Sequence, residues 1–316
     1  MYANDKNLRL NHTCVIGGGG FIGRSLVEQL KRTGRKVTVI GRKNNSVFTG
    51  EVTYLHSESN RPGLFFDDLK DVDEVIDLSY TTTPQTSFAD PIKDIIDNLQ
   101  VTVELFEKLC NCNVKKLVYV SSGGTVYGQA VSAPISEEHP TNPVSPYGIT
   151  KLAIEKYGKM YHDTRQLPII IVRPANAYGE GQQPFMGQGF IPTAIATVLQ
   201  GKKIRIYGEK GTVRDYIHSS DVAGGIIAAL DHGAIGACYN IGTGIGRTNF
   251  EVVESIASLM EPIGHHCEIE YLPHRSFDVK TNILDSTKLH SISGWTPKME
   301  FNKGLEATIG WAIAKK

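Results

Sequence analysis

The chain has 316 residues, of which 41% are apolar and 21% charged, a composition typical of a globular protein with a sizeable core. Lys and Arg number 33, as do Asp and Glu, so we expect no broad charged surface for nucleic acid or a membrane. No run of about 18 apolar residues and no apolar signal segment near the start occurs, which predicts neither a membrane span nor secretion.

The cysteines are odd in number and scattered, at Cys14, Cys110, Cys112, Cys238 and Cys267. This pattern predicts reduced thiols and a cytoplasmic location rather than a disulfide framework. Neither the pair Cys110/Cys112 nor the run 265–267 has a second ligand pair at the spacing of a zinc site, so no metal is expected.

The first predicted unit is a strand, a helix and a second strand. Residues 13–16 form a short apolar run that ends in a glycine-rich turn at 17–23. A helical pattern of apolar and polar residues follows until Gly34, and residues 36–40 predict the next strand. Such a unit, with tight turns at both ends, is typical of parallel strands joined by a crossover helix.

The same alternation continues along the next part of the chain. Predicted strands cover residues 72–78, 116–120 and 168–172, and predicted helices cover 90–109 and 147–161. This order predicts an α/β fold, a Rossmann-like, doubly wound parallel sheet with helices on both faces. Ligands in such sheets bind at the carboxyl ends of the strands.

The composition of the sequence changes after residue 173: glycines and prolines become frequent, and stretches with a helical pattern are short. We therefore predict a dinucleotide-binding domain over residues 1–173 and mainly a smaller, substrate-binding lobe over 174–316. Within that lobe, residues 221–245 are expected to return to the first domain, beginning with a helix over 221–230.

A cofactor site is predicted at the first turn. Gly17, Gly20 and Gly23 lie in the pattern G-x-x-G-x-x-G, with Phe21 and Ile22 between the last two, directly between a strand and a helix. Glycines in that context permit a tight turn and close approach of the backbone to a pyrophosphate. The helix N-terminus adds free N–H groups and a partial positive charge.

The end of the second strand bears on the choice between NAD and NADP. An acidic residue there would accept a hydrogen bond from the ribose 2′-hydroxyl, whereas this chain has Arg42 and Lys43. Both cations could pair with a 2′-phosphate, so NADP(H) is favoured and NAD(H) remains possible.

A catalytic pair is predicted at the start of the helix over 147–161. Tyr147 and Lys151 are four residues apart and therefore share one helical face. A nearby ammonium favours the phenolate and makes proton exchange with a sugar hydroxyl or ketone feasible.

Together with these motifs, three further ones follow in order: the run 121–128 (SSGGTVYG), the run 173–179 (RPANAYG) and the run 214–218 (RDYIH). The chain resembles the extended short-chain dehydrogenase/reductase family over nearly its whole length. It is similar in particular to the nucleotide-sugar 4-epimerases, 4,6-dehydratases and 4-ketoreductases.

The resemblance implies roles for single residues. Tyr147 would be the acid/base, and Lys151 would orient the cofactor ribose. The further positions implied to touch cofactor are Asn98 and Ser121, and those implied to hold a nucleotide-diphosphate sugar are Asn176, Arg214, Arg275 and Asp278. The resemblance also implies a homodimer and a setting in polysaccharide or O-antigen precursor synthesis.

One position departs from the family pattern. Gly123 stands where a serine or threonine is usual, so Ser122 or Thr125 must supply the hydroxyl. We favour Thr125, because alternate residues of a strand face the same side. Dehydratases carry an acid pair where this chain has Gly124 and Thr125, so water elimination is not expected.

Two enzymatic functions remain, with a third possibility. The first is NAD(P)H-dependent reduction of a nucleotide-linked 4-keto-6-deoxyhexose of the dTDP-4-dehydro-6-deoxyglucose type, favoured by Arg42 and Lys43. The alternative is a UDP-hexose 4-epimerase with bound NAD, acting on UDP-glucose or UDP-GlcNAc. A non-catalytic nucleotide sensor is the third, supported only by Gly123.

Overall fold

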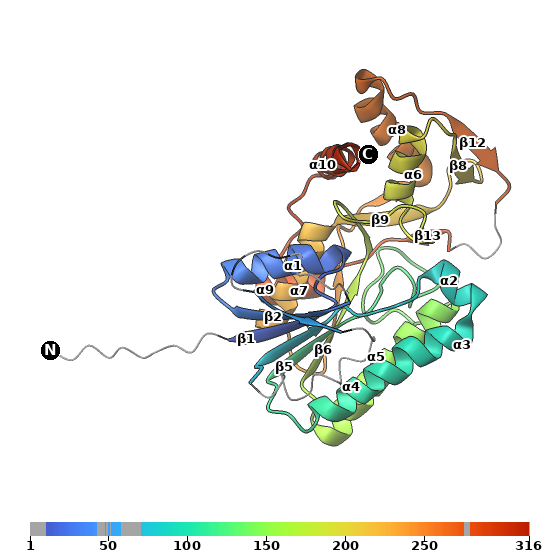
Figure 1. The fold of residues 1–316 in the computed structure, drawn as a ribbon. Coiled ribbons are helices and arrows are strands. Elements are labelled where there is room, and N and C mark those ends of the chain that lie inside the picture. The colour runs from blue at the N-terminus through green and yellow to red at the C-terminus, as the bar shows by residue number, and fades with distance from the viewer. Residues whose placement is uncertain are drawn as a thin grey trace.

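The computed structural model describes residues 11–42, 48, 50, 52–57, 71–274 and 279–315. At its centre lies a seven-stranded parallel sheet in the order β10-β6-β5-β4-β1-β2-β3 (Figure 1). Its strands are β1 (His12–Ile16), β2 (Lys36–Gly41), β3 (Val52–His56), β4 (Glu74–Asp77), β5 (Lys116–Val120), β6 (Ile169–Pro174) and β10 (Cys238–Ile241). The predicted Rossmann-like fold is confirmed.

The sheet is wound in two directions from its centre. The chain adds β2 and β3 on one side of β1, then crosses back and adds β4, β5 and β6 on the other. A crevice opens where neighbouring connections leave in opposite directions, at the carboxyl ends of β1 and β4. The ligand site of this fold is therefore expected next to the turn after β1.

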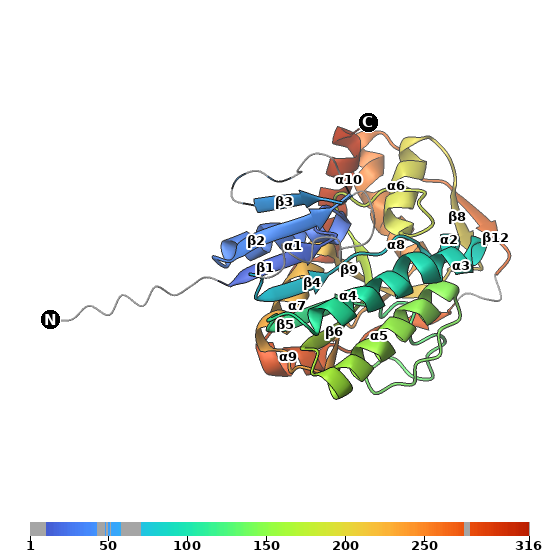
Figure 2. The ribbon, with the colours of Figure 1, turned by 60° about the horizontal axis from the view of Figure 1, so that its bottom comes forward.

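Helices cover both faces of the sheet (Figures 1 and 2). On one face lie α1 (Phe21–Arg32), α7 (Ser219–His232) and α9 (Thr287–Ser293), and on the other lie α4 (Val101–Leu109) and α5 (Pro146–Arg165). Alternate strand residues serve the two faces: Val15 packs with the α1 side, whereas Cys14 and Ile16 pack with the α4 side. Two apolar cores result, one on each side of the sheet.

The helix predicted over 90–109 is broken into several pieces. It consists of α3 (Pro91–Asp94), a π-helical segment η3 (Ile95–Gln100) and α4, and an unpredicted short helix, α2 (Pro84–Ala89), precedes it. Asp90 separates α2 from α3, because its side chain caps α3 by accepting a hydrogen bond from the Lys93 backbone. π-Helical turns occur often at functional sites, and this one lies beside the cavity described below.

The second lobe is built from small sheets and three helices, and it lies above the carboxyl edge of the main sheet in Figure 1. One sheet contains β7 (Asn176–Tyr178), β9 (Val213–His218), β11 (Gly246–Thr248) and β13 (Thr281–Asn282), and another contains β8 (Ile204–Tyr207) and β12 (Ile269–Leu272). The helices are α6 (Phe190–Leu199), α8 (Asn249–Met260), which runs into a short 3-10 turn, η4 (Glu261–Ile263), and α10 (Phe301–Ala314). They share a third apolar core.

A later part of the chain lies in the large domain. The helix α7 packs against α1, and β10 extends the main sheet by pairing with β6. These are the residues for which a return was predicted, although the helix begins at Ser219 rather than at 221. The division at residue 173 stays a prediction.

A buried ion pair fastens α5 to the sheet. The Arg173 guanidinium on β6 donates from Nε to Glu155 Oε1 at 3.0 Å, and from Nη1 to the Tyr127 hydroxyl at 2.9 Å. Ser121 also donates to Glu155, at 2.5 Å. This network holds the helix that carries Tyr147 and Lys151 against the ends of β5 and β6.

Replacing Arg173 by Met should destabilise the protein by about 3–5 kcal/mol, because it leaves the Glu155 carboxylate buried without its cation. Urea unfolding followed by circular dichroism measures this. The matched control is Lys159→Met, which breaks an exposed helical pair with Asp163 and should leave the midpoint within error. Equal effects of the two substitutions would contradict the assigned role of Arg173.

Candidate active site

The turn after β1 forms a cradle for an anion. Helix α1 begins at Phe21, and its N-cap, Gly20, offers no side chain to the free N–H groups of the first turn. A Cβ on Gly23 would lie 2.5 Å from the Gly18 oxygen, so glycine is required for the close packing of helix and turn. These residues line a cavity of about 360 Å³. The cradle fits the pyrophosphate of a dinucleotide.

In the described part of the chain, β2 ends at Gly41 and is followed directly by Arg42, without a carboxylate. A Cβ on Gly41 would lie 2.5 Å from the Tyr54 hydroxyl oxygen, so that hydroxyl fills the place of a longer side chain. The next residue, Arg42, is exposed, and its carbonyl is 3.2 Å from the His56 ring nitrogen Nε2. Lys43 lies outside the described residues. The strand thus ends close to where the sequence predicted, and the residue that follows it is a cation.

Tyr147 and Lys151 lie in the first two turns of α5, and both line the cavity. The helix starts there because Ser145 caps it, accepting a hydrogen bond from the Gly148 backbone at 3.1 Å, and because Pro146 occupies its first position. The Lys151 ammonium donates to the Val120 carbonyl oxygen at 2.9 Å. The structure thus brings the predicted pair to the crevice.

Burial acts on both groups in opposite directions. It raises the pKa of the Tyr147 phenol above its ordinary value, helped by the nearby Asp94 charge and opposed by a hydrogen bond with Ser122. Burial also lowers the pKa of Lys151 to about 8, opposed by the carboxylates of Asp77, Glu155 and Asp94. With this pKa, the Lys151 ammonium stays positively charged near neutral pH. Its charge can therefore favour the phenolate form of Tyr147.

The hydroxyl next to Tyr147 belongs to Ser122, which lines the cavity and whose interaction with the phenol lowers the pKa of Tyr147 against the effect of burial. Thr125 does not line it, and its hydroxyl points to the Ser122 carbonyl oxygen at 3.5 Å. The argument from strand alternation that favoured Thr125 does not apply, because β5 ends at Val120 and residues 123–127 form a turn. The geometry favours Ser122 instead.

The usual hydroxyl cannot be placed at Gly123. A Cβ there would lie 2.4 Å from a Leu284 methyl carbon and 2.9 Å from the Arg173 carbonyl oxygen. Leu284 is fully buried and fills the space. The departure from the family pattern is therefore part of the packing of this chain.

Asn98 lies behind the cavity surface, whereas Ser121 lies at it. Asn98 Oδ1 accepts hydrogen bonds from the Thr81 backbone at 2.8 Å and from the Thr81 hydroxyl at 3.1 Å, which holds the loop after β4. Thr81 itself lines the cavity. Ser121 lines it as well, but its hydroxyl is engaged by Glu155.

A second cavity, of about 240 Å³, adjoins the first on the side of the lobe. It is lined by two of the predicted substrate residues, Asn176 and Arg214, and the Nδ2 of Asn176 is buried without a partner among the described residues. The predicted residues Arg275 and Asp278 lie outside the described part of the chain. A buried amide and a guanidinium together suit phosphate oxygens.

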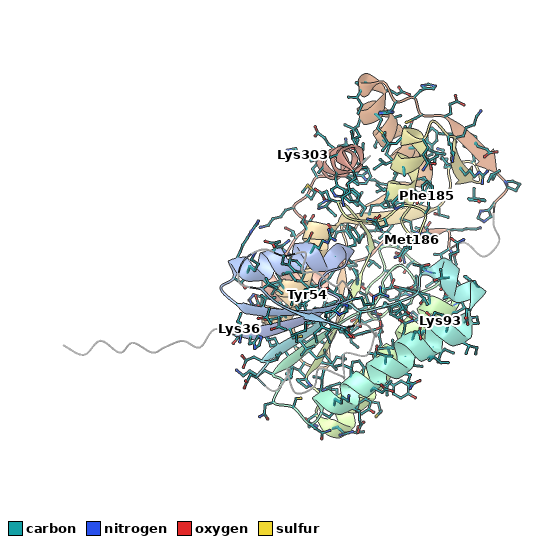
Figure 3. The ribbon with its side chains drawn as sticks, in the orientation of Figure 1. Lys36, Tyr54, Lys93, Phe185, Met186 and Lys303 are labelled. Atoms are coloured by element: carbon teal, nitrogen blue, oxygen red, sulfur yellow. The ribbon has the colours of Figure 1, made fainter. Side chains whose placement is uncertain are left out.

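Sequence reasoning missed the segment that joins the two cavities. Gln182 and Gln188, between β7 and α6, line both of them, and Met186 lines the first. Figure 3 shows Phe185 and Met186 on the side of the lobe that faces α2. The density of glycines in residues 179–189 is the available signal, and it predicts only that this stretch belongs to the substrate-binding lobe.

The comparisons with known proteins agree with this geometry. The family model described as the NAD dependent epimerase/dehydratase family matches residues 13–242. The chain belongs to this family. It is an enzyme of the epimerase/dehydratase type, and the resemblance to extended short-chain dehydrogenases/reductases is confirmed.

Several relatives match over nearly their full length. The UDP-glucose 4-epimerase of Mycolicibacterium smegmatis is 32% identical, with 94% of this chain and 97% of the relative covered. The UDP-glucose 4-epimerase of Thermotoga maritima, solved with UDP-glucose, has a TM-score of 0.87 at 29% identity and covers 96% of this chain and 99% of its own. That of Thermus thermophilus, solved with NAD, has a TM-score of 0.84 at 30% identity, with the same coverage.

The structure also bears on the predictions about cysteines, metal ligands and membrane spans. All five cysteines are free. In the described ranges, no three His, Cys, Asp or Glu side chains come together as metal ligands. Over the same part of the chain, no helix has the length and apolar character that crossing a membrane would require.

Gly123→Ala should destabilise the protein by about 1–3 kcal/mol, because the added methyl meets Leu284 and backbone. Gly124→Ala is the matched control, since a Cβ there meets nothing closer than Asn176 at 3.5 Å. Thermal unfolding measures both. A wild-type midpoint for Gly123→Ala would show that a serine could be accommodated at this position.

Proposed function

We propose that the protein is a UDP-hexose 4-epimerase that works with bound NAD. The observation that carries the proposal is the lining of the two adjoining cavities. Among the described residues, this lining contains Tyr147 as an acid/base group and contains no Asp or Glu. Epimerisation needs one group that takes a proton and returns it, whereas water elimination needs an additional acid and base.

The chain's own residues account for the proton steps. Tyr147, as the phenolate favoured by Lys151, removes the proton of the sugar C4 hydroxyl as C4 is oxidised to a ketone. When bound, the nicotinamide would supply reversible hydride exchange at the sugar C4. After the 4-keto sugar has turned over in the cavity, Tyr147 would give the proton back to the C4 oxygen. Ser122 lies beside the phenol and favours its deprotonated form.

The relatives support the choice of substrate. Several relatives of similar sequence are named as UDP-glucose 4-epimerases. One similar solved structure is a UDP-N-acetylglucosamine 4-epimerase. The second cavity, with Asn176 and Arg214, offers the polar groups for a nucleotide diphosphate. We therefore place the nucleotide in the second cavity and the hexose beside Tyr147.

A 4-ketoreductase is the second candidate, and Arg42 favours it. This side chain is exposed directly after β2, where no carboxylate would repel a 2′-phosphate. A consumed cofactor is commonly NADPH, so an NADP(H) site would suit reduction of a 4-keto-6-deoxyhexose. A sensor without turnover is opposed by the buried Tyr147 and Lys151.

The first experiment is to incubate the protein with NAD and UDP-glucose, or UDP-GlcNAc, and to follow the anomeric protons by NMR. We expect interconversion with the C4 epimer and no net reduction of free NAD. Tyr147→Phe should lower kcat by a factor of about 10²–10⁴, because it removes the acid/base. NADPH oxidation with dTDP-4-keto-6-deoxyglucose, without interconversion of UDP-hexoses, would replace the epimerase by the reductase.

Cofactor preference separates the two candidates independently of turnover. If NAD is the cofactor, Arg42→Ala should leave its Kd nearly unchanged while weakening NADP by about tenfold or more, the loss expected for one charge-assisted contact. Calorimetry measures both, with Arg32→Ala, an exposed arginine at the end of α1, as the control. Tighter binding of NADP than NAD by the unmodified protein would favour the reductase.

We also propose a homodimer formed through α3, η3 and α5. Large apolar side chains on these helices are exposed: Ile92, Ile95, Ile96, Ile149, Tyr157 and Met160. The helices lie side by side in both ribbon views (Figures 1 and 2). Sedimentation of the purified chain measures the assembly, and the cytoplasmic location stays a prediction.

A further inference from the structure

We propose that Tyr80 is a positioning residue whose ring forms the near wall of an aromatic cage that holds the Lys151 ammonium at the reaction centre without a contact ion pair. Three tyrosines surround this ammonium. Its nitrogen lies 4.0 Å from the centroid of the Tyr80 ring, 5.1 Å from that of Tyr119 and 5.9 Å from that of Tyr147. These distances are within the range of cation–π attraction, and Tyr80 is the closest.

The carboxylates around Lys151 make their hydrogen bonds to other groups, although Oδ2 of Asp77 and Oδ2 of Asp94 are buried without a partner among the described residues. Within the described ranges, no ion pair joins Lys151 to any of them; its one hydrogen bond goes to the Val120 carbonyl oxygen. Asp77 accepts from the Ser79 backbone at 2.9 Å, and Glu155 is occupied by Arg173 and Ser121. The third carboxylate, of Asp94, accepts from the hydroxyls of Thr82 and Tyr80.

The lack of a contact ion pair at Lys151, within the part of the chain that the structure describes, preserves the electrostatic field of its ammonium at Tyr147. A carboxylate in contact with the ammonium would cancel much of its field at Tyr147, and would occupy the donors needed for the cofactor ribose. An aromatic face carries no net charge, so it stabilises the cation and leaves its field in place. The ammonium has three donors, and Val120 takes one of them.

The Tyr80 ring is held from two sides. Its hydroxyl donates to Asp94 Oδ1 at 3.3 Å, and its ring stands edge-on to Tyr147, with centroids 4.8 Å apart. The next residue, Thr81, is fixed by Asn98. Asp94 is the N-cap of the π-helical segment and Asn98 lies within it, and both side chains reach the loop after β4.

The hydroxyl of Tyr80 does not take part in proton transfer in this geometry, because it faces Asp94 and Thr150. Burial raises its pKa, as do Tyr147 and Asp94, so the ring stays neutral. The groups that set the titration of Lys151 are thus the three cage tyrosines and the carboxylates of Asp77, Glu155 and Asp94. Burial lowers the pKa of the lysine, and the cage opposes this.

The test compares Tyr80→Leu, which removes the ring, with Tyr80→Phe, which keeps the ring and loses only the hydroxyl. The pKa of Lys151 is measured by NMR of the protein labelled with ¹³C at lysine Cε, with Lys151→Met to assign the signal. We expect Tyr80→Leu to lower this pKa by about 0.5–1.5 units. Tyr80→Phe should leave it unchanged within error.

An unchanged pKa in Tyr80→Leu would overturn the proposal, as would an equal fall in Tyr80→Phe, which would assign the effect to the hydroxyl and Asp94. If Tyr80→Leu does not fold, Tyr80→Met gives the same comparison with a longer apolar side chain. The titration needs no turnover, so it stands even if the proposed epimerase activity fails. If that activity holds, the alkaline limb of the kcat profile should fall by the same shift, while KM for the sugar is unchanged.

Discussion

The site depends above all on the buried contact between Glu155 and Arg173. It joins the middle of α5 to β6, so that the first turns of this helix, with Tyr147 and Lys151, meet the carboxyl ends of the strands. Both charges are almost completely withdrawn from water, and this is tolerable only because Ser121 and Tyr127 satisfy their remaining hydrogen bonds. A shift of α5 along the sheet would break this set of contacts at once.

Around that anchor, the chain builds a reaction centre with very few charges in contact. The lysine is buried, its pKa falls to about 8, and the only protein atom that its ammonium is seen to bind directly is a carbonyl oxygen. The carboxylates that surround it make their hydrogen bonds to other neighbours, and one oxygen each of Asp77 and Asp94 is buried without a partner among the described residues, so they act on the ammonium at a distance. A cation held in this way can favour the phenolate of Tyr147 and still bind a ribose.

The packing of Leu284 explains why glycine occupies position 123, where the family usually has serine or threonine. Gly123 leaves a space that Leu284, from a segment more than a hundred residues later, fills completely. The hydroxyl that supports Tyr147 is then supplied by the neighbouring Ser122. A change in a catalytic motif can therefore be a matter of packing, with the chemistry retained by the next residue.

The parallel sheet, the glycine turn and the pair Tyr147/Lys151 could be predicted from the sequence alone, because each depends on local periodicity or on residues a few positions apart. The choice of Ser122 over Thr125 could not, since it depends on where β5 ends and which way the following turn faces. The cage around Lys151 lay beyond sequence reasoning as well. Tyr80 lies in the loop after β4, Tyr119 on β5 and Tyr147 on α5, and only the packing of these parts of the fold brings their rings to one ammonium.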